Sequence, residues 1–160
     1  MYKAILVDDE SIIRNAISTT IDWNKFNFEL VDTCQNATQA IEILKHTHID
    51  LIITDICMPH MDGLELSSYV YNNYPDTSIV IISGYDDFNY AKQAIGIGVE
   101  DYLLKPITKN ALIERLSEIR SRYEHEKTQK EYYEKFQREM QAYEKNSSRD
   151  FFEALVGGSM

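Results

Sequence analysis

Short apolar runs alternate with amphipathic segments along the first 107 residues. Five runs have the length and composition of β-strands, at 3–7, 30–34, 50–54, 79–82 and 102–104. Four segments between them repeat apolar residues at helical spacing, at 12–20, 37–44, 64–70 and 91–95. Strands that alternate with helices predict an α/β fold, in which a five-stranded parallel sheet is doubly wound and covered on both faces.

The pattern changes near Pro106. From Asn110 a single helical pattern rich in Glu, Lys, Arg, Gln and Tyr continues without Gly or Pro until Gly157. Its apolar residues keep three- and four-residue spacings, at Leu112, Leu116, Ile119 and Tyr123 and again at Tyr133, Phe136, Met140 and Tyr143. Glu126 and Lys130 fall at seam positions between the two groups, so an uninterrupted coiled coil is not predicted.

Two interpretations of this long helix stay open. It is either the last helix of the sheet domain, which frays after Tyr123, or a linker that joins two protomers. The second is favoured because an isolated charged helix of this length needs packing. The polar stretch 146–148 predicts a break, followed by a short apolar helix at 151–156. We expect a sheet domain at 1–120 and a helical linker at 121–160.

Charge divides the chain in the same way. Residues 1–107 hold 6 basic and 16 acidic residues, whereas residues 108–160 hold 10 of each. The net charge of −10 thus belongs to the first segment, and direct nucleic-acid binding is not expected there because like charge repels phosphate backbones. The apolar runs are too short for a membrane span, and no export leader is seen. Cys34 and Cys57 suit free thiols, so we expect a cytoplasmic protein.

Reactive side chains stand at the carboxyl ends of the predicted strands. The first strand is followed by Asp8 and Asp9, the third by Asp55, the fourth by Ser83 and the fifth by Lys105. Ligands of parallel α/β sheets bind at this edge. Carboxylates about 4 Å apart repel by roughly 4 kcal/mol per pair at an effective dielectric near 20. Such a cluster needs either a cation or raised pKa values, and oxygen ligands suit Mg²⁺. A hydroxyl and an ammonium can hold phosphoryl oxygens, and Asp55 can be a nucleophile that forms an acyl phosphate.

Each of these residues also has an ordinary structural interpretation. An Asp or Ser at a strand end commonly caps a turn or helix, and a Lys-Pro pair is common in loops. The four positions, however, fall at the carboxyl ends of four strands of one predicted parallel sheet. That coincidence favours a shared chemical role over four unrelated caps.

Four motifs carry a family resemblance: Ala4–Glu10, Leu51–Pro59 with Met61–Gly63, Ile81–Tyr85 and Gly98–Pro106. Through them, residues 2–120 resemble the receiver domain of two-component response regulators. The resemblance implies a flavodoxin-like sheet with strand order 2-1-3-4-5. It also implies a cis peptide bond between Lys105 and Pro106.

The same resemblance implies roles in phosphoryl chemistry. Asp55 is the expected phosphoacceptor. Ser83 and Lys105 are expected to hold the phosphoryl oxygens, and Ser83 and Tyr102 are the expected switch residues.

Mg²⁺ is the cofactor that the resemblance implies. Its expected direct ligands are Asp9, Asp55 and the main-chain carbonyl of Cys57, and Asp8 is expected to bind it through water. We expect no enzyme in the usual sense, because such a domain catalyses only its own phosphorylation and dephosphorylation.

The segment 83–91 resembles response regulators that carry an AraC-type DNA-binding output. The implied phosphodonor is a sensor histidine kinase. A homodimer is expected through the face of the fourth and fifth helices and through the linker helix, with DNA contacted only by an output domain that this sequence lacks. A fragment of such a regulator and a natural stand-alone receiver, acting through protein contacts, both fit the sequence.

A haloacid-dehalogenase-like phosphohydrolase is the alternative from another functional class. It also uses a strand-end Asp nucleophile, Mg²⁺, Ser or Thr, and Lys. It needs a second acid two residues after the nucleophile to protonate the leaving group. That position is Cys57, so turnover of external phosphoesters is not expected.

Overall fold

The computed structural model describes residues 1–84, 96 and 101–157, and the predicted helix at 91–95 lies outside the described residues. The elements follow in the order β1 (Tyr2–Val7), α1 (Ser11–Thr20), the 3₁₀ helix η1 (Trp23–Phe26), β2 (Phe28–Cys34), α2 (Ala37–His46), β3 (Leu51–Asp55), α3 (Gly63–Asn73), β4 (Ser78–Ser83), β5 (Asp101–Leu104) and α5 (Lys109–Gly157). Each of the five predicted strands is confirmed within two residues of its expected ends. The helix η1 has no counterpart among the predicted elements.

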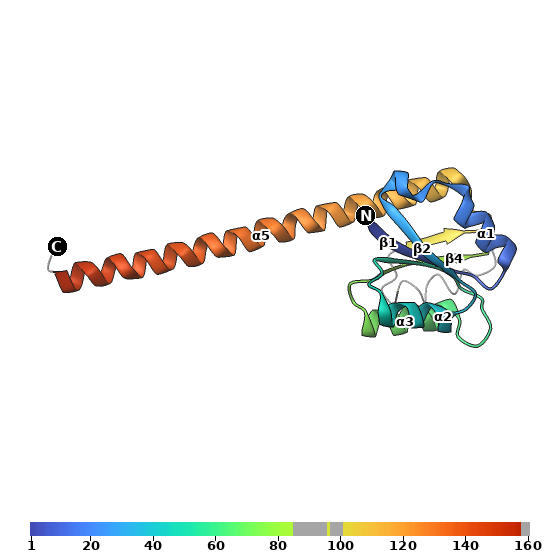
Figure 1. Cartoon of the computed structure of the whole chain (residues 1–160), viewed down its shortest axis with the longest axis horizontal. Coiled ribbons are helices and arrows are strands. Elements are labelled where there is room, and N and C mark those ends of the chain that lie inside the picture. Colours follow the sequence, from blue (N-terminus) through green and yellow to red (C-terminus); the bar gives the residue numbers. More distant parts are fainter. Residues whose placement is uncertain (85–95, 97–100, 158–160) are drawn as a thin grey trace. The chain divides into compact units, whose positions relative to one another are not determined.

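The described strands form one sheet with the order β2-β1-β3-β4-β5, and every pairing is parallel. Figure 1 shows α2 and α3 together on one side of this sheet and α1 on the other. The predicted doubly wound, flavodoxin-like fold is therefore confirmed. The chain moves outward from β1 to β2 and then crosses to β3 on the opposite side. The carboxyl ends of β1 and β3 consequently flank the switch point at which ligands of such sheets bind.

Both faces of the central strands are buried. Ile5 and Val7 of β1 pack in one apolar cluster with Ala40 of α2 and Leu66 of α3. All five residues of β3 are buried as well, as the consecutive apolar run predicted. Each fully buried aliphatic side chain contributes about 1.5–3 kcal/mol relative to an exposed one. The strands therefore form a firmly packed support for the side chains at their carboxyl ends.

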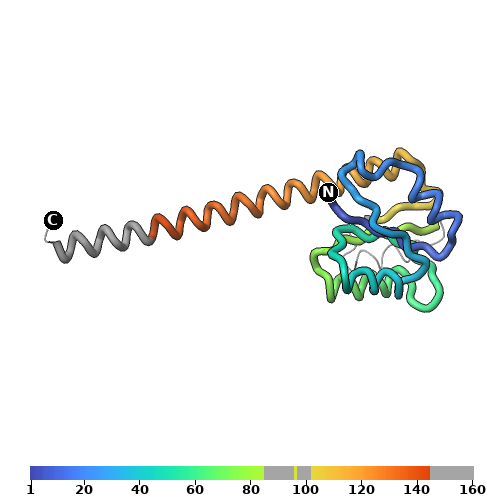
Figure 2. The backbone as a smooth tube through the Cα atoms, viewed as in Figure 1, coloured from blue at the N-terminus to red at the C-terminus, as the bar shows by residue number. Residues whose placement is uncertain are grey.

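The chain divides into two units, Met1–Ser117 and Glu118–Met160. In the first unit, Leu112 and Leu116 of α5 are buried. In the second unit, the side chains of residues 124–144 are exposed along the helix, whose backbone can be followed in Figure 2.

The predicted helix break at 146–148 is wrong, because α5 continues without interruption to Gly157. Asn and Ser cost a helix less than about 0.7 kcal/mol each relative to Ala. Three such residues do not end a helix that has no Gly or Pro before Gly157. Among the residues that the structure describes, no helix combines the length and the apolar character needed to cross a membrane.

Candidate functional site

The strand-end side chains meet at the carboxyl edge of the sheet. Lys105 Nζ lies 3.2 Å from Asp55 Oδ1 and 3.5 Å from Asp8 Oδ2. The register explains this convergence, since Val7 pairs with Thr54 and thereby sets Asp8 beside Asp55. The predicted grouping of these three residues is thus observed in the structure.

Ser83 reaches the same edge through the pairing of β4 with β5. It pairs with Leu104, and its main-chain carbonyl accepts a hydrogen bond of 2.7 Å from the N–H of Lys105. The peptide bond from Lys105 to Pro106 is cis, as predicted. Ser83 is fully buried. Its hydroxyl contacts the hydroxyl of Tyr102 and also donates to the carbonyl of Gly84 at 3.2 Å.

Asp55 is buried, with only 4% of its surface exposed. Its Oδ1 accepts a hydrogen bond of 2.9 Å from the N–H of Ile56. Burial raises the pKa of Asp55 above its usual value, and the charge of Asp8 adds to this rise, whereas Lys105 and the Ile56 N–H oppose it. A carboxylate with a raised pKa is a more basic nucleophile once it is ionised. Asp55 is therefore suited to forming a covalent bond with an electrophilic phosphorus atom.

The ammonium of Lys105 stays charged in this setting. Burial lowers its pKa, but the charges of Asp55 and Asp8 outweigh burial and raise that pKa above its usual value. The site therefore holds a cation between two buried carboxylates.

Three consecutive acids after β1 could hold a metal ion. Oxygen atoms of Asp8, Asp9 and Glu10 lie within 4.8 Å of one another. Asp8 Oδ1 accepts a hydrogen bond from the N–H of Glu10 at 2.9 Å, but Asp8 Oδ2 is buried and has no hydrogen-bond partner. Its ion-pair partner Lys105 Nζ lies 3.5 Å away, which is too long for a good hydrogen bond. A divalent cation with oxygen ligands would satisfy this buried oxygen more fully. The donor set therefore fits Mg²⁺.

The loop after β3 borders the same cluster. Asp9 and Asp62 line a cavity of about 370 Å³ together with the loop residues Ile56, Cys57, Met58 and Pro59. The structure thus brings the predicted ligand Cys57 to the cavity that Asp9 lines. Its side chain is exposed.

Gly63 fixes the approach of α3 to the phosphoacceptor strand. Its N–H donates to the carbonyl of Ile56 at 2.8 Å, and Asp62 caps the helix by accepting from the N–H of Glu65 at 2.8 Å. A Cβ atom at position 63 would lie 2.3 Å from the carbonyl oxygen of Asp55. Only Gly therefore fits this position without moving the backbone that carries Asp55.

Sequence reasoning missed one polar contact at the site. Arg14 Nη1 donates to the main-chain carbonyl of Asp8 at 2.6 Å. Because the acceptor is a backbone atom, no complementary side chain in the sequence marks this contact. Only the six-residue separation from Asp8 and the position of Arg14 early in α1 could have indicated this contact.

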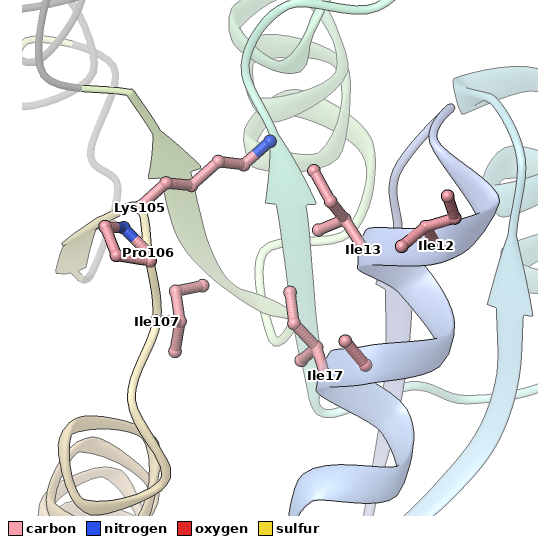
Figure 3. A pocket seen from close by; sticks show the side chains of 7 residues that line it. Ile12, Ile13, Ile17, Lys105, Pro106 and Ile107 are labelled. Carbon is pink, nitrogen blue, oxygen red and sulfur yellow. The ribbon is translucent and has the colours of Figure 1, made fainter.

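An apolar groove also lies beside the site. Its lining combines residues of α1 with the segment after β5: Ile12, Ile13, Ala16, Ile17, Lys105, Pro106 and Ile107. The groove has a volume of about 380 Å³. Figure 3 shows the α1 side chains on one side and Pro106 and Ile107 on the other, with Lys105 extending along one end. Ile12 is 82% exposed, which is unusual for a large aliphatic side chain.

Comparison with known proteins places these features in one family. The family model of the response regulator receiver domain matches residues 4–117. The uncharacterized transcriptional regulatory protein YesN of Bacillus subtilis is 34% identical over 158 residues, which cover 99% of this chain and 43% of YesN. The transcriptional regulatory protein HptR of Staphylococcus aureus is 36% identical over 107 residues, covering 67% of this chain and 42% of HptR. The chain spans less than half the length of these curated relatives.

Solved structures agree with this placement. The REC domain of AraT, a response regulator from Geobacillus stearothermophilus, has a TM-score of 0.74 and 40% identity, covering 79% of this chain and 98% of that one. A two component transcriptional regulator AraC from Clostridium phytofermentans has a TM-score of 0.67 and 34% identity, covering 74% and 92%. The chain belongs to the response regulator receiver domain family.

Proposed function

We propose that the chain accepts a phosphoryl group on Asp55 from a phosphohistidine of a sensor histidine kinase. The observation that carries this proposal is the Lys105 ammonium, which lies 3.2 Å from Asp55 and 3.5 Å from Asp8 at the edge of a parallel sheet. Asp8 Oδ2 is buried and accepts no hydrogen bond, and its ion-pair partner Lys105 Nζ lies 3.5 Å away, which leaves room for a second cation beside it. Nucleophile, fixed cation and metal ligands are the parts that phosphoryl transfer requires.

The transfer is a displacement at phosphorus. A carboxylate oxygen of Asp55 attacks and a P–O bond forms, while the P–N bond to the donor imidazole breaks. The imidazole leaves with that electron pair and takes a proton from water. The product is an acyl phosphate, and attack by water on its phosphorus later releases phosphate and restores the Asp55 carboxylate.

The chain's own residues stabilise the charge that moves during transfer. Lys105 is already held at Asp55 and can follow a phosphoryl oxygen, and the Ser83 hydroxyl can donate to another. Asp9, Asp55 and the carbonyl of Cys57 would hold Mg²⁺ directly, with Asp8 acting through water. When bound, Mg²⁺ neutralises charge on the phosphoryl oxygens.

The domain acts on itself rather than on external substrates. In a haloacid-dehalogenase-like phosphohydrolase, proton transfer to the leaving group needs a second acid two residues after the nucleophile. The residue two positions on is Cys57, whose exposed thiol is a poor acid for this purpose. We therefore infer that hydrolysis is limited to the domain's own acyl phosphate.

The apolar groove suits a helix of the phosphodonor. It ends at Lys105, whose ammonium reaches Asp55, so a helix seated against Ile13 and Ile107 would bring a histidine on its surface close to the phosphoacceptor. The exposed Ile12 adds apolar area at the rim. Helices with apolar anchors at three- and four-residue spacing are the usual occupants of such grooves.

Ser83 and Tyr102 connect the site to the outer surface. Their hydroxyls are in contact, so a Ser83 hydroxyl that moves to donate to a phosphoryl oxygen changes its contact with Tyr102. The ring of Tyr102 packs partly buried against the core and would then settle in a new position. We infer that this movement alters the surface at β5 and the start of α5.

The exposed stripe of α5 makes self-association the expected response. Large apolar side chains stand exposed at helical spacing within residues 118–144, namely Tyr133, Phe136, Met140 and Tyr143. A second copy of the same helix would cover them, which a charged helix of this length needs for stability. By analogy with the transcriptional regulators that the chain resembles, we infer a transcriptional output that binds DNA through a further domain.

Phosphorylation with a small-molecule phosphodonor and Mg²⁺ tests the proposed acceptor. One phosphoryl group should be added per chain, stable in acid and labile in base. Asp55→Asn should abolish it, whereas the matched change Asp76→Asn at an exposed position should not. A phosphoryl group that persists on Ser, Thr or His in Asp55→Asn would contradict the assignment.

A further inference from the structure

Arg14 anchors the backbone of the acidic turn. Its Nη1 donates to the Asp8 carbonyl at 2.6 Å, from a half-buried position on α1. The same residue Asp8 is held at two more atoms, since its N–H donates to the carbonyl of Cys34 at 3.0 Å and its Oδ1 accepts from the N–H of Glu10 at 2.9 Å. Of its polar atoms, only Oδ2 has no hydrogen bond. Oδ2 instead lies 3.5 Å from the Lys105 ammonium, so it is the atom of Asp8 that faces a cation.

Two cations therefore flank the acidic cluster. Lys105 contacts the carboxylate of Asp8, and Arg14 contacts its main chain. The charge of Arg14 also reaches the end of β2, where burial and Asp32 raise the pKa of Cys34 to about 12 and Arg14 opposes them. The guanidinium comes from α1, whereas Lys105 extends from the segment after β5.

We propose that Arg14 is a positioning residue for the Mg²⁺ site, which it serves by fixing the main chain of Asp8 and thereby the direction of the Asp8 and Asp9 side chains. The inference rests on the proposed function, because it concerns the same metal. Arg14 has no place among the expected ligands. It acts through the main-chain carbonyl of Asp8, whose carboxylate would hold the metal through water.

A positioning role and a purely electrostatic role of Arg14 predict opposite changes in Mg²⁺ affinity when Arg14 is removed. If the guanidinium acted only as a nearby positive charge, its removal would strengthen binding of a divalent cation. If it holds the turn, its removal lets the two carboxylates spread and weakens binding. Outer partners of metal ligands commonly contribute 10–100-fold to metal affinity. A contact through one main-chain carbonyl lies at the low end of that range.

The test is the Mg²⁺ dissociation constant of the full chain, measured by titration calorimetry. Arg14→Met should raise it about tenfold. Arg14→Lys should keep most of the affinity, because an ammonium can donate to the same carbonyl. Lys45→Met removes an exposed positive charge on α2 and should leave the constant unchanged. Repeating the titrations in 1 M salt, where charges are screened beyond about 3 Å, should preserve the effect of Arg14→Met.

The outcomes separate this inference from the proposed function. Absence of Mg²⁺ binding by the unchanged chain would overturn the metal site itself. Normal binding by the unchanged chain with equal or tighter binding by Arg14→Met would overturn only the role of Arg14. If Arg14→Met does not fold, as urea unfolding without metal would reveal, Arg14→Lys and Arg14→Gln decide the matter. Affinity in the order Arg, Lys, Gln supports positioning, and equal affinity in all three refutes it.

Discussion

The two buried carboxylates of the site depend on the charge of Lys105, so Lys105→Met should destabilise the fold. Lys105 Nζ lies 3.2 Å from Asp55 Oδ1 and 3.5 Å from Asp8 Oδ2. Each attraction amounts to roughly 5 kcal/mol at an effective dielectric near 20. Desolvation offsets much of it, and removing one partner of a buried ion pair costs about 3–5 kcal/mol. Since 21% of the Lys105 side chain is exposed, we expect about 3 kcal/mol at neutral pH.

The size of this loss should depend on pH. Burial and then Asp8 raise the pKa of Asp55, whereas Lys105 lowers it. A carboxyl whose pKa is raised by folding stabilises the fold while it is protonated, and this contribution disappears as the pH rises through the folded-state pKa. Without Lys105 that pKa rises further, so ionisation of Asp55 costs the variant more than it costs the unchanged chain. The difference in stability should be larger at about pH 8 than at about pH 5.

Urea unfolding, followed by circular dichroism and by the fluorescence of buried Trp23, measures both quantities. A chelator keeps divalent ions from replacing the missing charge. Lys45→Met is the matched control, because Lys45 is exposed and its ion pair with Glu42 at 3.9 Å contributes little. An equal loss of stability at both pH values would refute the electrostatic explanation.

Three further predictions concern packing, metal and switching. Gly63→Ala should lower the free energy of unfolding in urea by about 1–3 kcal/mol, because its Cβ atom would clash with backbone atoms. Gly96→Ala, where a Cβ atom would meet no atom within 4 Å, should not lower it. Similar losses in the two variants would contradict the proposed clash. Asp9→Ala should abolish most Mg²⁺ binding measured by calorimetry, and Asp8→Ala should weaken it less. The reverse order would make Asp8, and not Asp9, the direct ligand. A beryllofluoride mimic of the phosphoryl group should strengthen self-association in analytical ultracentrifugation, and Ser83→Ala should remove this response, so equal association with and without the mimic would end the proposed coupling.

The sheet and the convergence of the site could be predicted because few physical rules govern them. A parallel sheet buried on both faces requires consecutive apolar residues, as in β3. Parallel strands also bring their carboxyl ends to one edge, so Asp8, Asp55, Ser83 and Lys105 had to gather once the strands were placed. The pattern of residue types at four strand ends therefore carries most of the information on the site.

Two kinds of feature could not be predicted from the sequence: contacts whose partner is a backbone atom, and structures that are decided by small differences in free energy. The hydrogen bond from Arg14 has a main-chain acceptor, and the helix η1 follows a local turn in which Asp22 accepts from the N–H of Asn24. The break expected at 146–148 failed because weak helix formers were given the weight of helix breakers. The contact of Ser83 with Tyr102 depends on side-chain rotamers, which the sequence pattern does not determine.

The central claim is that Asp55 carries the phosphoryl group, and the most direct test locates it chemically. The phosphorylated chain is treated with borohydride, which reduces an aspartyl phosphate to homoserine, and is then digested and sequenced by mass spectrometry. Homoserine is expected at position 55 and at no other Asp. Homoserine at Asp8 or Asp9, or a phosphoryl group on a hydroxyl or imidazole with Asp55 unchanged, would contradict it.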